Sequence, residues 1–543
     1  MMKKTIKKLL AALLAVAMVC AMAIPAFAGT EGDITKWHSF SAFQNFKGDV
    51  KGNNIKDFKI SNVTWGSNIA DNPAAFLDQL KADSTLGTQF QFIDATDANT
   101  AQKVLEVISK WDDSDAYSIA FARSVCHYLY PDANAKPKPA VEGGGGSDHI
   151  HFNEAGYYLV VDTTPFSHGD FDHAYNSFLL MVTHEDWNIP ITPKAEKPSV
   201  KKEVFDNFDN QDVTSTGDFG SSADHAINEK FQFKLTATLP ASTDHAYDYY
   251  DTYAVCFKDT LSEGITYDGP DSVVIKSNNN THDTTIDSSK YDIDTKNLEN
   301  QNYFEVNIHD VKACAKDAGF DLNDGATITF TYTAHRNEKA TVNTTSGPTE
   351  NKNSVQLQYS NNPRPGDYWG TTPKSEVYVF TYQLNNTKRA ETENGTPLPG
   401  AGFKLYSDKA YEHEVKLYKE GNFYYPIKNA PDKTPVEMKS ADDGTFNVRG
   451  LDAGTYYLKE TTTPADFTPC SVIPPVTITA NHNGNHVELD SSKLSTTIIN
   501  KKAGGITLPS TGGIGTSLFY VVGGGLMVAA IVLLVTKKRM ENK

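Results

Sequence analysis

Two sets of polar residues fall on the faces of predicted β-strands that should be buried. Each set holds a lysine, a carboxylate and an asparagine with the alternation parity of apolar neighbours in the same strand. The sets are Lys202, Asp259 and Asn353, and Lys388, Glu460 and Asn500. Parity alone favours Lys202 over the adjacent Lys201. Burying an unpaired ammonium or carboxylate costs several kcal/mol, so both sets need a way to lose their charge.

Such a set can neutralise itself by forming a covalent bond. Desolvation lowers the pKa of a lysine and raises that of a carboxylic acid, which favours a neutral amine beside a protonated acid. The amine is then a nucleophile, and the acid can polarise the asparagine carbonyl. Attack would expel ammonia and leave a Lys–Asn isopeptide bond, with Asp259 and Glu460 as the promoting carboxyls. The alternative is an ordinary buried ion pair with a hydrogen-bonded asparagine.

Alternating apolar and polar residues supply the strands that would carry these sets. Residues 231–239 alternate strictly, which is typical of a strand with one buried face. Asn-Gly at 394–395 and Asp-Gly at 443–444 are typical hairpin turns. The sequence therefore predicts a mostly β protein with tandem immunoglobulin-like β-sandwiches over residues 196–383 and 384–503, and β structure throughout the first of them.

Residues 29–195 predict a mixed α+β domain in front of these sandwiches. Apolar spacing indicates three helices and two strands, over 72–80, 101–111, 115–129, 156–161 and 176–182. Histidines and aspartates between 149 and 173 match no standard ligand spacing, so we expect no metal and no cofactor. We assign no crosslink to this domain.

Composition points to an extracellular protein without a disulfide framework. The 543-residue chain has a formal net charge of −17, which argues against nucleic acid as a partner. Beyond residue 28 its cysteines are widely scattered, and we predict mostly free thiols. They are Cys126, Cys256, Cys314 and Cys470.

The chain begins with an export signal. Residues 1–28 combine early lysines, an apolar run and an Ala-x-Ala site, which predicts a signal peptide cleaved between Ala28 and Gly29. The other end, residues 504–543, combines a pentapeptide, an uncharged apolar run over 514–535 and a basic tail. The run is long enough to cross a membrane as a helix, with the tail in the cytoplasm.

The order of these C-terminal parts resembles the cell-wall sorting signal of Gram-positive surface proteins. The pentapeptide is Leu508, Pro509, Ser510, Thr511 and Gly512. The resemblance implies that a sortase cleaves between Thr511 and Gly512, holds an acyl-enzyme and passes the threonine to an amine. It also implies attachment to peptidoglycan, with the membrane helix as a holding device before cleavage.

Three stretches resemble the domains of sortase-assembled backbone (major) pilins. Residues 253–266 and 353–363 resemble an isopeptide-forming fimbrial domain. Residues 457–464, with Glu460 in the sequence Tyr-Leu-Lys-Glu-Thr, resemble the E-box of a collagen-adhesin B-type domain. The resemblance implies a structural subunit of a pilus shaft, with sortase and other pilin subunits as partners.

A candidate acceptor for the next subunit lies between the first two predicted domains. Backbone pilins carry a tryptophan and then Tyr-Pro-Lys there, and this chain has Trp187 and then Thr192-Pro193-Lys194. The resemblance implies that the Lys194 amine accepts the threonine. Because the tyrosine is replaced, Lys197 and Lys201 remain alternatives.

Two other readings stay open. A monomeric wall-anchored adhesin, or a basal or ancillary pilin, would use the same tail, and host extracellular matrix or glycans would then be candidate partners. An enzyme is disfavoured, because the chain has no G-x-S-x-G, P-loop or complete zincin motif. The only chemistry expected of the protein is its own crosslinking.

Overall fold

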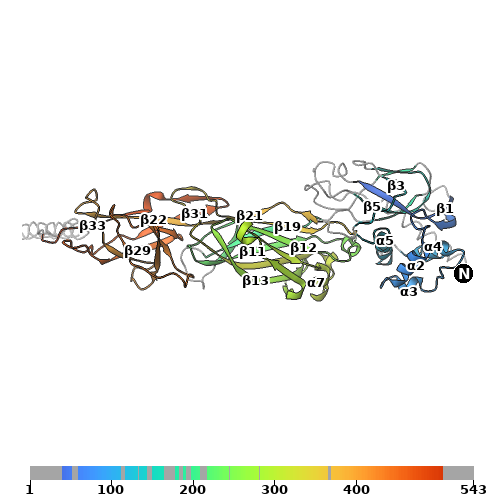
Figure 1. Ribbon diagram of the computed structural model, residues 1–543, viewed down its shortest axis with the longest axis horizontal. Coiled ribbons are helices and arrows are strands. Elements are labelled where there is room, and N and C mark those ends of the chain that lie inside the picture. Colours follow the sequence, from blue (N-terminus) through green and yellow to red (C-terminus); the bar gives the residue numbers. More distant parts are fainter. Residues whose placement is uncertain are drawn as a thin grey trace, which may run out of the picture.

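The computed structural model places three groups of elements in a row along the longest axis of the molecule (Figure 1). It describes residues 39–51, 59–111, 116–132, 134–142, 149–163, 178–182, 187–190, 197–207, 217–243, 245–280, 282–364 and 369–504. Several predicted features lie outside these residues: the signal cleavage site, Lys194, the pentapeptide at 508–512 and the apolar run at 514–535.

The N-terminal group is a sheet covered on both faces. Its strand order is β2-β1-β5-β6, with β3 beside β1, and β4 pairs with β7 separately. The strands are β1 (Phe40–Lys51), β2 (Lys59–Trp65), β3 (Val141–Glu142), β4 (His149–Phe152), β5 (Gly156–Asp162), β6 (Phe178–Val182) and β7 (Trp187–Pro190). The helices are α2 (Pro73–Ala82), α3 (Gly87–Phe90), α4 (Thr100–Ile108) and α5 (Ala116–Leu129).

Two cores explain why strand β5 is buried along its whole length. On one side Leu159 and Val161 pack with apolar residues of the helices, and on the other Tyr158 and Val160 pack with Ile150 of β4. The three predicted helices and two predicted strands are confirmed within a few residues. The long strand β1 was not predicted.

The middle group is a sandwich of two sheets around one large core. One sheet has the order β10-β21-β19-β12-β16-β15, with β20 beside β19, and the other has β14-β13-β17-β11-β8-β9. The strands are β8 (Ser199–Asp206), β9 (Asp218–Gly220), β10 (Ser222–Asp224), β11 (Lys230–Leu239), β12 (Val255–Leu261), β13 (Ile265–Ser277), β14 (Thr284–Thr285), β15 (Tyr291–Asp294), β16 (Tyr303–Ile308), β17 (Ala326–Arg336), β18 (Gly347–Pro348), β19 (Lys352–Ser360), β20 (Trp369–Thr371) and β21 (Ser375–Phe380).

The expectation of β structure throughout this segment is wrong. Helix α7 (Val311–Asp317) lies in it, because Val311, Cys314 and Ala315 recur at helical spacing and pack on the sandwich core. Shorter helical turns are α6 (Leu298–Gln301), η2 (Ala246–Tyr249), η3 (Ser288–Lys290) and η4 (Leu322–Asp324). The mostly β fold class itself is confirmed.

The last group is a smaller pair of sheets, ordered β25-β26-β28-β22-β33 and β24-β23-β29-β30, with β27 beside β23. The strands are β22 (Tyr382–Ala390), β23 (Gly402–Tyr406), β24 (Glu414–Val415), β25 (Leu417–Glu420), β26 (Phe423–Pro426), β27 (Met438–Lys439), β28 (Val448–Leu451), β29 (Gly454–Thr462), β30 (Val476–Ile478), β31 (Ala480–Asn483), β32 (His486–Leu489) and β33 (Ser495–Asn500), and η5 spans Ser491–Lys493. The first and last strands of this segment along the chain, β22 and β33, pair in parallel.

The middle and last groups are joined by main-chain and apolar contacts. Hairpin β31–β32 pairs with β18 of the middle segment, forming a three-stranded sheet between the two sandwiches. Ile227 is fully buried against Tyr418, Tyr425 and Ile427 of the last group. The joint therefore has a core of its own.

No disulfide joins Cys126, Cys256, Cys314 and Cys470, all of which lie in the described part of the chain. Among the helices of the described residues, none has both the length and the apolar character needed to span a bilayer.

Candidate crosslinking sites

The first predicted set meets in the middle sandwich. Lys202 lies on β8 in one sheet, and Asp259 and Asn353 lie on the neighbouring strands β12 and β19 of the other. Lys202 is 2% exposed, and Asp259 and Asn353 are completely buried. Lys201, in contrast, has 70% of its side chain exposed and pairs with Glu203 at 2.7 Å. The pleat of β8 therefore sends only the second lysine into the core.

The three side chains converge on a fourth residue, Tyr332 of β17. The Lys202 ammonium forms an ion pair with Asp259 Oδ2 and lies 3.2 Å from the Tyr332 hydroxyl. That hydroxyl donates to Asp259 Oδ1 at 3.2 Å and accepts from the Asn353 side-chain nitrogen. Tyr332 therefore holds the amide beside the amine and the acid.

Tyr332 was not among the site residues predicted from the sequence. A signal was available, because a tyrosine on a buried strand face needs a partner for its hydroxyl. Asn353 Oδ1 has no hydrogen-bond partner among the described residues. The carbonyl oxygen of the amide is thus buried without a donor.

Burial shifts both ionisable groups towards their neutral forms. It lowers the pKa of Lys202 to about 8, although the charge of Asp259 opposes this. Burial likewise raises the pKa of Asp259, against the opposing effect of Lys202. A proton can therefore pass from the amine to the acid at a smaller free-energy cost than in water.

The second predicted set meets in the last sandwich. Lys388 on β22 and Asn500 on β33 lie on adjacent parallel strands, with Lys388 opposite Ile498 and Asn500 opposite Ala390. Glu460 lies on β29 of the facing sheet. The side chains of Lys388 and Glu460 and the whole of Asn500 are almost completely buried.

The contacts here are direct, without a bridging tyrosine. Lys388 Nζ donates to Asn500 Oδ1 and lies 3.5 Å from Glu460 Oε1. Asn500 Nδ2 donates to the same Oε1 at 2.7 Å, and the Cys470 amide donates to Oε2 at 2.6 Å. Burial lowers the pKa of Lys388, although Glu460 opposes the shift. The contact of Cys470 with Glu460 was not predicted from the sequence.

Both sites can support the same chemistry. Each places a buried lysine amine with a depressed pKa close to an asparagine amide and a carboxyl group, in a core that excludes water. An amine, an amide and an acid in this arrangement can exchange the amide nitrogen for the lysine nitrogen.

Two parts of the chain match models of known protein families. Residues 384–493 match the SpaA model, described as a prealbumin-like fold domain. Residues 500–542 match the LPXTG cell wall anchor motif. A curated relative, the trypsin-resistant surface T6 protein of Streptococcus pyogenes, is 26% identical over 408 residues, which are 64% of this chain and 70% of the relative.

Solved pilin structures show similarity at low sequence identity. The T6 backbone pilin of S. pyogenes has a TM-score of 0.46 at 15% identity, over 87% of this chain and 97% of that one. A C-terminal fragment of the major pilin GBS80 of Streptococcus agalactiae has a TM-score of 0.39 at 22% identity, over 56% of this chain and 99% of the fragment. With a prealbumin-like domain directly before an LPXTG anchor, the chain is a cell-wall-anchored surface protein that is similar to the T6 surface protein of S. pyogenes.

Proposed function

We propose that this chain is a shaft subunit of a sortase-assembled pilus whose two β-sandwiches are each closed by a Lys–Asn isopeptide bond. The observation that carries the proposal is the burial of two complete sets of lysine, carboxyl and asparagine. The chain is a structural subunit and not an enzyme, and its chemistry is confined to itself. The domain boundaries at 195/196 and 383/384 remain predictions.

The first step is a proton transfer. Lys202 and Asp259 begin as an ammonium and a carboxylate in contact, and the proton moves from Nζ to Oδ2. Because burial disfavours both charges, the neutral pair lies closer in free energy to the charged pair than it would in water. The amine then has a free electron pair beside the Asn353 amide.

The second step exchanges one C–N bond for another. Lys202 Nζ attacks Cγ of Asn353, and the electron pair of the C=O bond moves to Oδ1. The protonated Asp259 stabilises the negative charge that develops on this oxygen. When the tetrahedral intermediate collapses, the bond to Nδ2 breaks, and Nδ2 leaves as ammonia with one proton from Nζ. Asp259 serves as the carrier of this proton. The products are a neutral secondary amide, one ammonia molecule and a protonated Asp259, which keeps the proton taken in the first step.

Lys388 and Asn500 follow the same course, with Glu460 as the proton carrier. The 2.7 Å contact between Glu460 Oε1 and Asn500 Nδ2 places the carboxyl at the leaving nitrogen. The bond spans 112 residues here and roughly 150 in the middle sandwich. By the chain-entropy model for disulfides, loops of this length stabilise the fold by about 4–5 kcal/mol each.

The position of the second bond suits a load-bearing shaft. Strands β22 and β33 begin and end the last sandwich and run parallel to each other. Tension that enters at β22 and leaves at β33 shears them along their length, and only hydrogen bonds would otherwise resist it. A bond between Lys388 and Asn500 carries this load covalently.

Polymerisation needs the sortase signal and an acceptor amine. We propose that the acyl group of Thr511 passes to Lys194 of the next subunit. A monomeric surface adhesin is the second candidate, because the LPXTG anchor alone serves it equally well.

The crosslinks predict a mass deficit. The intact secreted chain should weigh about 34 Da less than its sequence, since each bond releases ammonia of about 17 Da. In Asp259→Ala and in Glu460→Ala, the deficit relative to the mass calculated from each variant's own sequence should fall to about 17 Da, because one bond is lost. Intact-mass spectrometry measures this difference. Asp268→Ala, which removes a carboxylate paired with His335 on the surface, should keep the full deficit. An unshifted wild-type mass would refute both bonds.

Tyr332→Phe tests the positioning of Asn353. Without the hydroxyl, the Asn353 nitrogen loses its partner, so bond formation in the middle sandwich should slow at least several-fold, by the roughly 1–3 kcal/mol that an orphaned polar group costs. Intact mass followed over time after refolding measures this rate.

Tyr267→Phe is the matched control. Its ring packs against Tyr332 at 5.4 Å, but its hydroxyl has no hydrogen-bond partner within the described structure. This variant should crosslink at the wild-type rate. Equal rates in both variants would contradict the role given to Tyr332.

Lys194→Ala tests polymerisation. Cell-wall extracts of the wild type should show a ladder of high-mass bands, and the variant should show only a monomer, because the acceptor amine is gone. Lys197→Ala, at an exposed neighbouring lysine, should leave the ladder intact. A single band in the wild type would favour the monomeric adhesin.

A further inference from the structure

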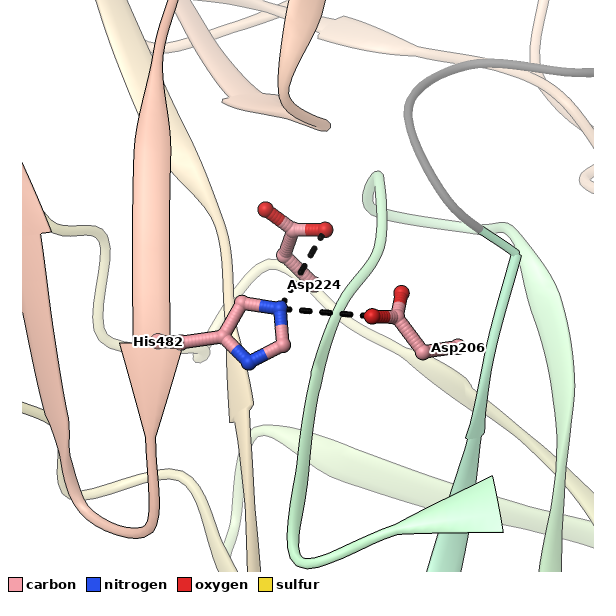
Figure 2. Close-up of side chains that lie close together, drawn as sticks. All are labelled: Asp206, Asp224 and His482. Atoms are coloured by element: carbon pink, nitrogen blue, oxygen red, sulfur yellow. Dashed lines mark ion pairs between the residues drawn. The ribbon is translucent and has the colours of Figure 1, made fainter. Parts of the chain in front are cut away.

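A cluster of ionisable side chains lies where the middle and last sandwiches meet. Asp206 ends strand β8, Asp224 ends strand β10, and His482 reaches them from strand β31 of the last group (Figure 2). One donor atom from each of the three lies within 4.8 Å of the others. The cluster takes no part in the crosslinks, and nothing in the sequence spacing predicted it.

One separation within the cluster matches that of two ligands on a common zinc ion, and the other is slightly longer. His482 Nε2 lies 3.4 Å from Asp206 Oδ2 and 3.9 Å from Asp224 Oδ1. Both separations exceed the usual N–H···O distance of about 2.9 Å. Donors at 2.0–2.2 Å from a tetrahedral zinc ion stand roughly 3.3–3.6 Å apart.

Two further observations point to a ligand. Asp206 is only 9% exposed, yet its Oδ1 has no hydrogen-bond partner among the described residues. His482 Nδ1 lies 2.9 Å from Ser222 Oγ on the far side of the ring. When Nδ1–H donates to this hydroxyl, Nε2 presents its lone pair to the carboxylates, which is how protein scaffolds orient a metal-binding histidine.

A buried arginine lies near the cluster but directs its hydrogen bonds elsewhere. Asp224 accepts a hydrogen bond from the Tyr382 hydroxyl at 2.8 Å through Oδ2 and faces His482 through Oδ1. Arg336 is the buried cation nearby, but its guanidinium donates to the main-chain carbonyls of Val379 and Thr341.

A neighbouring set is already satisfied by a lysine. His225, Glu229 and Asp452 also lie within 4.8 Å of one another. However, Glu229 accepts from Lys428 at 3.0 Å, from Asn207 at 3.1 Å and from the Ala226 amide at 2.9 Å. A lysine ammonium is the cation of that set.

We propose that Asp206, Asp224 and His482 bind a divalent zinc-like cation that clamps the last sandwich to the middle one. One imidazole and two carboxylates suit Zn²⁺, with water in the fourth position, whereas Ca²⁺ and Mg²⁺ prefer oxygen ligands alone. The clamp connects two strands of the middle sandwich with the hairpin that already pairs with β18. It is independent of the isopeptide bonds.

The competing explanation is a protonated His482 that pairs with both aspartates. The groups that face this cluster are Asp206, Asp224, Asp452, Tyr382 and Arg336, with Glu229, His225 and Lys428 behind them. An imidazolium would make the joint more stable at acidic pH and indifferent to zinc. A zinc site behaves in the opposite way, because protons compete with the metal for the ligands.

Zinc titration of the chelator-treated secreted chain separates these explanations. Calorimetry at pH 7.5 should show about one Zn²⁺ per chain with a dissociation constant of 10 μM or tighter, and 1 mM Zn²⁺ should then raise Tm, because a ligand at about 100 times its Kd stabilises the folded state. Ca²⁺ and Mg²⁺ should have little effect.

Variants locate the site. His482→Gln and Asp206→Asn should each weaken zinc binding at least tenfold, and the second variant decides if the first does not fold. His486→Gln, at an exposed histidine of the same hairpin, should bind as the wild type does. Absence of stoichiometric binding, binding unchanged in both cluster variants, or loss of binding in His486→Gln would overturn the proposal.

Discussion

An ammonium group and a carboxyl group lie together in the core of each β-sandwich. An asparagine amide is held beside them by Tyr332 in the middle sandwich and by direct hydrogen bonds in the last one. Groups of this kind are costly to bury, and replacing them by apolar residues often stabilises a protein. Their retention in both sandwiches is understandable if they do not remain charged. An isopeptide bond removes both charges from the core and leaves a neutral amide in their place.

The rest of the architecture places these groups where tension would act. In the last sandwich the bonded residues lie on adjacent parallel strands at its beginning and end. In the middle sandwich Lys202 and Asn353 lie on opposite sheets, so their bond would staple the two layers together. Between the sandwiches, hairpin β31–β32, the buried Ile227 and the Asp206–Asp224–His482 cluster hold the joint. The proposed bonds would thus reinforce each sandwich, and the contacts between the sandwiches are separate from them.

Strand periodicity was enough to find both sets, because alternation assigns every residue of a regular strand to one face. It distinguished Lys202 from Lys201 correctly as regards burial. It could not find Tyr332, because the ring of this residue fits the apolar pattern while its hydroxyl hydrogen-bonds to Asp259 and Asn353. Helix α7 was missed although Val311, Cys314 and Ala315 recur at helical spacing, because it has only seven residues and lies among strands. The cluster around His482 could not be found, since contacts between domains leave no periodic trace in a single sequence.

Tandem mass spectrometry of peptides from the proteolysed secreted chain tests the central claim most directly. The account predicts two branched peptides, one joining Lys202 to Asn353 and one joining Lys388 to Asn500, each lighter by one ammonia than its two linear parts. Recovery of all four residues only in linear, unmodified peptides would contradict it, and the buried sets would then be ordinary ion pairs.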